Sequence, residues 1–205
     1  MLKIYIARHG QNEDNANGIL NGHRDMPLTA IGENQAHQLA NGVKDAGLTF
    51  DAVYTSPLKR ASRTAEVVCK VLGMNEPVVM DSLIERDFGI MTGKPVSDIE
   101  KLCAPDIVKT STITYFLSPA GAETFPNLLV RAARALDQIR TEHSSGSVLL
   151  VTHGDFGKMI YTSYYGLRWQ DTLTNFHFGN CELLMLAPNA NPNVPHVINI
   201  EQHNH

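Results

Sequence analysis

The chain has 205 residues, of which 43% are hydrophobic and 19% are charged, with 15 glycines and 10 prolines. This composition is close to the globular average and excludes collagen, long coiled coils and extended disorder. The formal net charge of -4 gives no general attraction to nucleic acid or to an anionic membrane surface, so neither is expected as a partner. We therefore expect one folded domain over residues 1–205.

The cysteines and the N-terminus bear on the compartment. Cys69, Cys103 and Cys181 are odd in number and form no C-x-x-C pair, so neither a disulfide framework nor a cysteine zinc site is predicted. The apolar start of the chain is interrupted at Arg8, too early for the core of a signal peptide, and no stretch approaches the roughly 18 apolar residues of a membrane span. The expected location is cytoplasmic.

The first half of the chain alternates between short apolar strands and amphipathic helices. A strand is predicted at 2–7, and a helix at 29–46 with Thr29 as its N-cap. A second strand at 51–55 precedes a helix that is predicted to start at Pro57 and to end before Gly73.

The second half continues this alternation. A short strand at 78–80, a helix at 125–143, a strand at 147–152 and a helix at 154–165 are predicted, and three stretches that could add edge strands are 176–178, 182–186 and 197–200. A turn-rich surface loop is expected between Pro188 and Pro195. The strand at 147–152 is apolar without interruption, which is typical of a strand covered on both faces. The alternation predicts an α/β fold: a three-layer α/β/α sandwich with a mostly parallel sheet.

Basic side chains follow three of the predicted strands. Arg8 and His9 end the first strand, Arg60 follows the second, and His153 follows the strand at 147–152. Because ligands of open α/β sheets bind beyond the carboxyl ends of the strands, we expect these groups to meet at one edge. Guanidinium groups suit phosphate oxygens, and imidazole is a nucleophile near neutral pH, so the cluster indicates a phosphoryl ligand. Such a site also needs a proton donor for the departing alcohol.

Six blocks of sequence, in order between about residue 3 and residue 160, carry a more specific pattern. They are R-H-G at 8–10 with Asn15, D-M-P-L-T at 25–29 with Gly32 and Gln35-Ala36, S-P-L-x-R-A-x-x-T-A at 56–65, E-x-x-F-G at 85–89, G-x-E at 121–123 and V-T-H-G at 151–154. Together they resemble the histidine phosphatase superfamily, the phosphoglycerate mutase-like proteins. The resemblance implies that family's fold and a single histidine phosphatase-like catalytic domain over residues 1–205.

The resemblance also implies a mechanism. His9 becomes a phosphohistidine, while Glu85 protonates the leaving oxygen and later deprotonates the attacking water. Arg8, Arg60 and His153 hold the phosphoryl oxygens and complete the expected catalytic set. No metal and no other cofactor is expected, because these cationic side chains neutralise the charge. Asp87 remains an alternative to Glu85 as the acid, and a structural role is favoured for Glu123.

A wider set of residues is expected to bind the substrate. Asn15 adds a neutral donor, and Asn12 stands where the family commonly has a hydroxyl group. His23 and Arg24 could meet a second anionic group. The whole expected binding set is Arg8, Asn12, Asn15, His23, Arg24, Arg60, His153 and Gly154.

Three functions are considered. The favoured one is a metal-independent phosphatase that hydrolyses a small phosphorylated metabolite. A phosphoglycerate mutase-type isomerase is the first alternative, disfavoured because only residues 86–120 separate the acid from the G-x-E block, where mutases carry a longer excursion. A non-catalytic binding module is the second, disfavoured because every expected catalytic residue is present. The oligomeric state is open, with a dimer among the options. Because His9 must be neutral while Glu85 keeps its proton, an acidic to neutral pH optimum is predicted.

Overall fold

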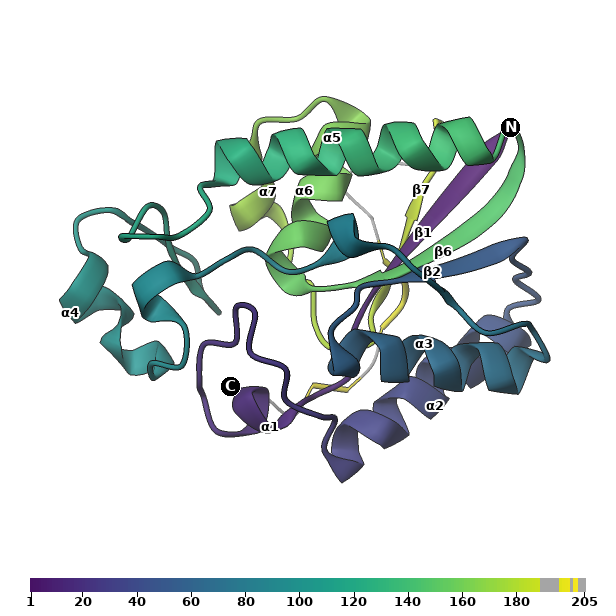
Figure 1. The fold of residues 1–205 in the computed structure, drawn as a ribbon, viewed down its shortest axis with the longest axis horizontal. Coiled ribbons are helices and arrows are strands. Elements are labelled where there is room, and N and C mark those ends of the chain that lie inside the picture. Colours follow the sequence, from purple (N-terminus) through teal and green to yellow (C-terminus); the bar gives the residue numbers. More distant parts are fainter. Residues whose placement is uncertain (189–195, 200, 203–205) are drawn as a thin grey trace.

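The computed structural model describes residues 1–188, 196–199 and 201–202 (Figure 1). At its centre lies a six-stranded sheet in the order β3-β2-β6-β1-β7-β8. The strands are β1 (Leu2–Arg8), β2 (Ala52–Thr55), β3 (Val78–Val79), β6 (Gly146–Thr152), β7 (Leu183–Leu186) and β8 (His196–Ile198). β1, β2, β3 and β6 run parallel, whereas β7 is antiparallel to β1 and β8 is antiparallel to β7. The predicted mostly parallel sheet is confirmed.

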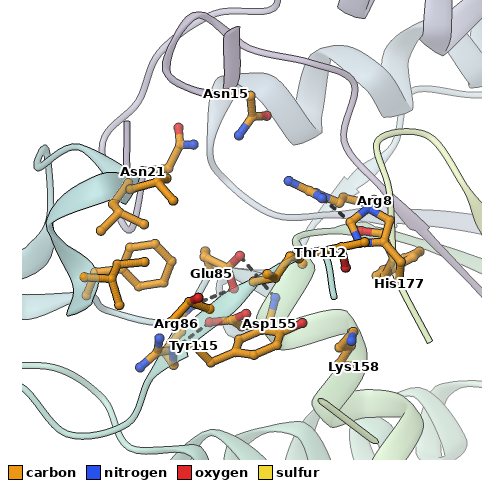
Figure 2. Close-up of a pocket in the computed structure, with 18 of the residues that line it drawn as sticks. Arg8, Asn15, Asn21, Glu85, Arg86, Thr112, Tyr115, Asp155, Lys158 and His177 are labelled. Carbon is orange, nitrogen blue, oxygen red and sulfur yellow. Dashed lines mark hydrogen bonds and ion pairs between the residues drawn. The ribbon is translucent and has the colours of Figure 1, made fainter. Parts of the chain in front are cut away.

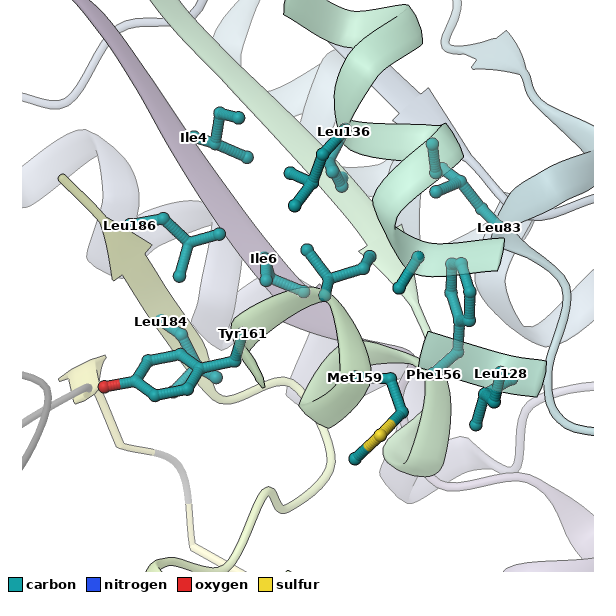
Figure 3. Close-up of a cluster of buried hydrophobic side chains, with 14 of the residues drawn as sticks. Ile4, Ile6, Leu83, Leu128, Leu136, Phe156, Met159, Tyr161, Leu184 and Leu186 are labelled. Atoms are coloured by element: carbon teal, nitrogen blue, oxygen red, sulfur yellow. The ribbon is translucent and has the colours of Figure 1, made fainter. Parts of the chain in front are cut away.

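Helices cover both faces of this sheet. α2 (Ala30–Asp45) and α3 (Lys59–Leu72) pack on one face, and α5 (Phe125–Glu142), α6 (Gly154–Tyr165) and α7 (Trp169–Asn175) pack on the other (Figure 1). Successive side chains along each strand point to opposite faces of the sheet and so contribute to both hydrophobic cores. In β1, for example, Ile4 and Ile6 join the core under α5 and α6 (Figure 3), while Tyr5 and Ala7 join the core under α2 and α3. The three-layer α/β/α arrangement is therefore confirmed.

The sequence determines where several helices begin and end. The hydroxyl of Thr29 accepts a hydrogen bond from the Gly32 amide and caps α2, as predicted. Thr124 caps α5 in the same way. α3 ends at Gly73, whose φ of 68° is the left-handed conformation that glycine adopts at little cost.

A long excursion of residues 80–124 connects β3 to α5. It contains the helix α4 (Ile99–Cys103), the hairpin of β4 (Ile107–Lys109) and β5 (Thr114–Phe116), and three short 3-10 turns at Asp81–Leu83, Gly89–Met91 and Val96–Asp98. Together with Leu20, which lies between α1 and α2, it forms a hydrophobic cluster separate from the two cores of the sheet: Leu20, Phe88, Met91, Ile99, Cys103 and Phe116. In Figure 1 the excursion with α4 lies beside the sheet, on the same side as the short helix α1 (Glu13–Ala16).

Two sequence predictions are wrong in their details. Residues 176–178 form no strand, because the carbonyls of Phe176 and Phe178 accept hydrogen bonds from the side chains of Lys158 and Arg8 rather than from a neighbouring strand. α3 begins at Lys59 and not at Pro57, since the carboxylate of Asp25 accepts the hydrogen bond from the Lys59 amide at 2.7 Å.

Other predictions stand in part. β3 and β8 are shorter than the stretches at 78–80 and 197–200 suggest, and position 200 lies outside the described residues. The expected surface loop after Pro188 lies outside them as well. In the part of the chain that the structure describes, no helix is long and apolar enough to cross a membrane.

Candidate active site

Two histidines follow neighbouring parallel strands. His9 comes directly after β1 and His153 directly after β6, and the long helices that follow them, α2 and α6, lie on opposite faces of the sheet. Open α/β sheets bind their ligands at such a switch point. The amide of His9 donates to the Thr152 carbonyl at 2.9 Å, and the centroids of the two imidazole rings are 5.1 Å apart. The strand order thus brings together two groups that are far apart in the sequence.

The hydrogen bonds of His9 define its protonation state. Its Nε2 lies 3.1 Å from the Nε of Arg60, which can only donate, so Nε2 carries a lone pair. Its Nδ1 then carries the proton and donates to the Gly10 carbonyl at 2.7 Å. Burial lowers the pKa of His9 well below its ordinary value, and the charges of Arg60 and Arg8 lower it further. The ring is therefore neutral near pH 7, and its unprotonated Nε2 lies beside the Arg60 cation.

The two arginines are cations without carboxylate partners among the described residues. Arg60, in the first turn of α3, is fully buried and also donates to the carbonyls of Gly22 and Arg24. Arg8 is partly buried and donates to the carbonyl of Phe178, and its buried Nε has no hydrogen-bond partner among the described residues. Within the described residues neither guanidinium forms an ion pair. Because unpaired buried charges are costly, this pair indicates a site for an anion.

Glu85 lies near the start of the excursion and faces these cations. Its Oε1 accepts from the amides of Arg86 at 2.8 Å and of Phe156, in the first turn of α6, at 3.1 Å. Burial raises the pKa of Glu85, and the neighbouring charge of Asp155 raises it further. The carboxylate of Asp87, the alternative acid, instead accepts from the Gly89 amide and is not part of the cavity wall. Glu85 is thus the better placed of the two.

A cavity of about 760 Å³ opens above these groups. Arg8, His9, Arg60 and Glu85 line its inner end, and the excursion forms much of the remaining wall. Figure 2 shows Glu85, Arg86, Asp155 and Tyr115 on one side of the cavity, with Arg8 and His177 on the other. Its volume is that of a typical small-molecule site.

Some of the expected binding residues lie at this cavity. Asn15 and Gly154 line it. A methyl group added to Gly154 would approach Arg8 and Glu85 at 3.7 to 3.9 Å, so the glycine leaves room between these two groups. His153 lies beside His9 with its Nε2 2.7 Å from the Ser56 hydroxyl, and its Nδ1 is buried without a partner in the described part of the chain.

His153 and three other expected binding residues do not line the cavity. Asn12 caps α1 by accepting from the Asn15 amide, and it donates to the Asn21 side chain at 2.6 Å. Arg24 forms an ion pair with Asp14 at 2.8 Å, and His23 Nε2 lies 2.8 Å from the Glu85 carbonyl. Local partners hold the side chains of Asn12, His23 and Arg24, and their contact with the substrate stays a prediction.

Arg86 and Asp155 are cavity residues that the sequence analysis missed. They form an ion pair at 2.7 Å, and both line the cavity (Figure 2). The Arg86 guanidinium also lies over the rings of Phe88, Phe116 and Phe125, at 4.4 to 5.0 Å from their centroids. The position of Asp155 in the sequence, two residues after His153 and next to Gly154, indicates that it lies near the site.

Arg131 was also missed, and it holds the segment that carries Glu85. From α5 it donates to the backbone carbonyls of Ser82, Ile84 and Glu85 at 2.6 to 3.2 Å. Its guanidinium pairs with Glu123 at 2.7 Å, which confirms the structural role favoured for that residue. This network fixes the backbone of the candidate acid to the helical layer.

The described residues contain no group of three or more His, Cys, Asp or Glu side chains that could hold a metal ion. The cavity combines two guanidiniums without carboxylate partners in the described chain, an imidazole with an unprotonated nitrogen and a carboxyl group with a raised pKa. Together these can bind an anion, attack it and supply a proton.

The fold and this site define an α/β protein with a candidate anion site at the switch point of its sheet. A family model described as the histidine phosphatase superfamily (branch 1) matches residues 4–201. The chain therefore belongs to this superfamily, and the resemblance noted from its motifs is confirmed.

Individual relatives include phosphatases and mutases. The chain is 34% identical over 155 residues to a Bacillus subtilis protein named uncharacterized phosphatase PhoE, covering 75% of this chain and 72% of that one. It is 29% identical over 180 residues to a 2,3-bisphosphoglycerate-dependent phosphoglycerate mutase of Rhizobium etli, covering 84% and 85%. The fold is similar to that of a mycobacterial glucosyl-3-phosphoglycerate phosphatase in complex with VO3, with a TM-score of 0.78, 21% identity and coverage of 90% and 92%.

Proposed function

We propose that this protein is a phosphomonoesterase that hydrolyses a small phosphorylated metabolite through a phosphohistidine on His9. One observation carries the proposal: the lone pair of His9 Nε2 lies beside the unpaired buried guanidinium of Arg60, at the inner end of a cavity that Arg8 and Glu85 also line. Membership of the superfamily and the similarity to a named phosphatase support it.

In the first half-reaction the phosphoryl oxygens accept hydrogen bonds from Arg8, Arg60 and His153. Nε2 of His9 attacks phosphorus, the ester P–O bond breaks, and Glu85 gives its proton to the leaving alkoxide oxygen. The hydrogen bond from Nδ1 to the Gly10 carbonyl stabilises the positive charge that the ring acquires.

In the second half-reaction the Glu85 carboxylate takes a proton from water. The water oxygen attacks phosphorus, the P–N bond breaks, and inorganic phosphate leaves with His9 and Glu85 restored. The guanidiniums supply the charge stabilisation throughout, so the proposed reaction proceeds without a metal ion.

The pKa shifts support these roles. The lowered pKa of His9 keeps the nucleophile unprotonated down to mildly acidic pH. The raised pKa of Glu85 keeps the acid protonated above the ordinary carboxyl range. The two shifts widen the pH interval in which both groups are in the reactive form, on the acidic to neutral side.

A phosphoglycerate mutase activity is the second candidate, favoured by the similarity to the Rhizobium etli mutase. A mutase must keep the phosphohistidine from water and return its phosphate to another hydroxyl group. The non-catalytic alternative is disfavoured, since the nucleophile, the acid and the cations are all present.

A panel of phosphomonoesters, assayed for released phosphate and for isomerised product in the presence of a chelator, tests the proposal. Phosphate release without isomerisation, lost in His9→Ala, is the expected result. Isomerisation that depends on a bisphosphate primer would assign the mutase activity instead. Phosphate release by His9→Ala at the wild-type rate would overturn the role of His9.

A further inference from the structure

The outer part of the cavity has an apolar wall. Beyond the phosphoryl end this wall is made by Ile19, Leu20, Phe88, Val96, Ile99 and Ile113, while Thr110, Ser111, Thr112 and Thr114 add uncharged hydroxyl groups to the lining. Leu20, Phe88 and Ile99 also belong to the hydrophobic cluster of the excursion, which supports the wall from behind. A cavity of about 760 Å³ has room for far more than a phosphoryl group, so the leaving group meets this wall.

The cations beyond the phosphoryl end are already neutralised or occupied. Arg86 is paired with Asp155 and lies among three phenylalanine rings. Lys158 donates to the backbone carbonyls of Thr172, Leu173 and Phe176, and burial lowers its pKa to about 8.

The remaining titratable groups there offer no cation either. Burial lowers the pKa of His177 to about 4, so it is neutral near pH 7. Asp155 itself lines the cavity, and its carboxylate opposes a second negative charge on a substrate. Beyond the phosphoryl end, a carboxylate or a second phosphate would therefore lose its water and meet, among the described lining residues, cations that are paired with a carboxylate or already donate to backbone carbonyls.

Building on the phosphomonoesterase function, we propose that the substrate is the phosphate ester of an uncharged alcohol with a bulky apolar body, and that Asp155, by pairing with Arg86, excludes esters that carry a second anionic group. Asp155 acts here as a specificity-determining residue, and the apolar wall selects the size of the leaving group.

Three esters with similar leaving oxygens separate these effects: ethyl phosphate, hexyl phosphate and the phosphate ester of ω-hydroxyhexanoate. For the wild-type protein we expect kcat/KM for hexyl phosphate to exceed that for ethyl phosphate by on the order of tenfold, because several methylene groups leave water. The carboxylate-ended ester should fall on the order of tenfold below hexyl phosphate.

Two variants test which residues cause the preference among these esters. Asp155→Asn should bring the carboxylate-ended ester to within about threefold of hexyl phosphate, because Arg86 is then free to bind it. Val96→Asp, at a half-exposed cavity position, should lower kcat/KM for hexyl phosphate by a larger factor than that for ethyl phosphate. Val130→Asp, equally exposed on α5 away from the cavity, is the matched control and should change neither.

Binding separates this inference from the proposed function. If none of the esters releases phosphate, the phosphomonoesterase function fails, and calorimetric dissociation constants of the three esters with His9→Ala still test the selectivity. Tighter binding of hexyl phosphate than of ethyl phosphate or the carboxylate-ended ester supports the inference, provided that adding Asp155→Asn tightens the binding of the carboxylate-ended ester. Equal or tighter binding of the carboxylate-ended ester by the parent protein, or a preference that Asp155→Asn leaves unchanged, overturns it.

Discussion

The Nε of Arg60 lies 3.1 Å from the Nε2 of His9, with both side chains almost fully buried. The arginine thus fixes the tautomer of the imidazole and provides a positive charge at the atom proposed to form the phosphoryl bond. Removing either group changes both the charge and the hydrogen bonding of the site, which makes the pair a direct target for mutation.

Replacement of Arg60 by lysine keeps the charge but removes the planar fork that donates to His9, Gly22 and Arg24. We expect kcat/KM for phosphate release to fall on the order of a hundredfold. Arg63→Lys, on the exposed surface of the same helix, is the matched control and should keep wild-type kinetics. Equal kinetics for Arg60→Lys and Arg63→Lys would argue against phosphoryl contact by Arg60.

The pH dependence of kcat/KM should be bell-shaped. The acidic limb reports protonation of His9 and is displaced downward by its lowered pKa, while the alkaline limb reports deprotonation of Glu85 and is displaced upward by its raised pKa. Glu85→Gln should reduce the rate and abolish the alkaline limb. An unchanged alkaline limb in that variant would assign it to another group.

Stability should also depend on pH, through the two buried imidazoles. Burial lowers the folded-state pKa of His9 and of His153, so below the unfolded value of about 6.5 the unfolded chain binds protons that the folded protein does not. The free energy of unfolding should therefore decrease as the pH falls from about 7.5 to 5. His9→Gln should show a weaker decrease in denaturant titrations than the wild type.

In the same titrations, the ionisation of Glu85 changes the free energy of unfolding in the opposite direction. Its raised pKa favours folding below the ordinary carboxyl pKa, and this contribution is lost as the pH rises through the folded value. The comparison between His9→Gln and the wild type is therefore repeated in the Glu85→Gln background. An identical pH dependence with and without His9 in that background would contradict the assignment.

The glycines that follow the two histidines should respond differently to alanine. In Gly10→Ala the new methyl group would lie 2.5 Å from the backbone carbonyl oxygen of Gly32, so we expect a loss of about 1–3 kcal/mol in the free energy of unfolding. In Gly154→Ala the nearest atoms, on Arg8 and Glu85, are 3.7 to 3.9 Å away. This variant should fold normally and lose about tenfold in kcat, because the methyl group lies between two groups of the site.

Arg131→Met tests the positioning of Glu85 from α5. Loss of the guanidinium leaves the carbonyls of Ser82, Ile84 and Glu85 without these donors, at an expected cost of about 1–3 kcal/mol in unfolding free energy. A positioning role predicts a lower kcat and a displaced alkaline limb, with little change in KM. Glu123→Gln keeps an acceptor for Arg131 and should have a smaller effect. A stability loss without any change in the pH profile would leave Arg131 with a structural role alone.

The sheet and the location of the site could be predicted from the sequence because both depend on local patterns. Uninterrupted apolar runs mark the buried strands, and the residues directly after them, such as His9 and His153, are carried to one edge by the parallel order. The family motifs then indicate Glu85, which lies in a segment with little regular structure.

The environment of the site depends on contacts between distant residues, which no local pattern encodes. The pairing of Arg86 with Asp155 joins the excursion to α6. Arg24, which could meet a second anionic group of the substrate, forms an ion pair with Asp14 that its local sequence does not indicate. The stretch 176–178 has strand-like residues, yet side chains of β1 and α6 take two of its carbonyls.

Because the excursion has a small hydrophobic cluster, the contacts that support the apolar wall are separate from those that hold Glu85. The carboxyl group of Glu85 is attached to α6 through the Phe156 amide, and its backbone to α5 through Arg131, while the apolar wall rests on Leu20, Phe88 and Ile99. Replacements at the wall can therefore accumulate without disturbing the proton donor. New leaving-group preferences become accessible through exchange of a few side chains, on a reaction centre that stays anchored to the helical layer.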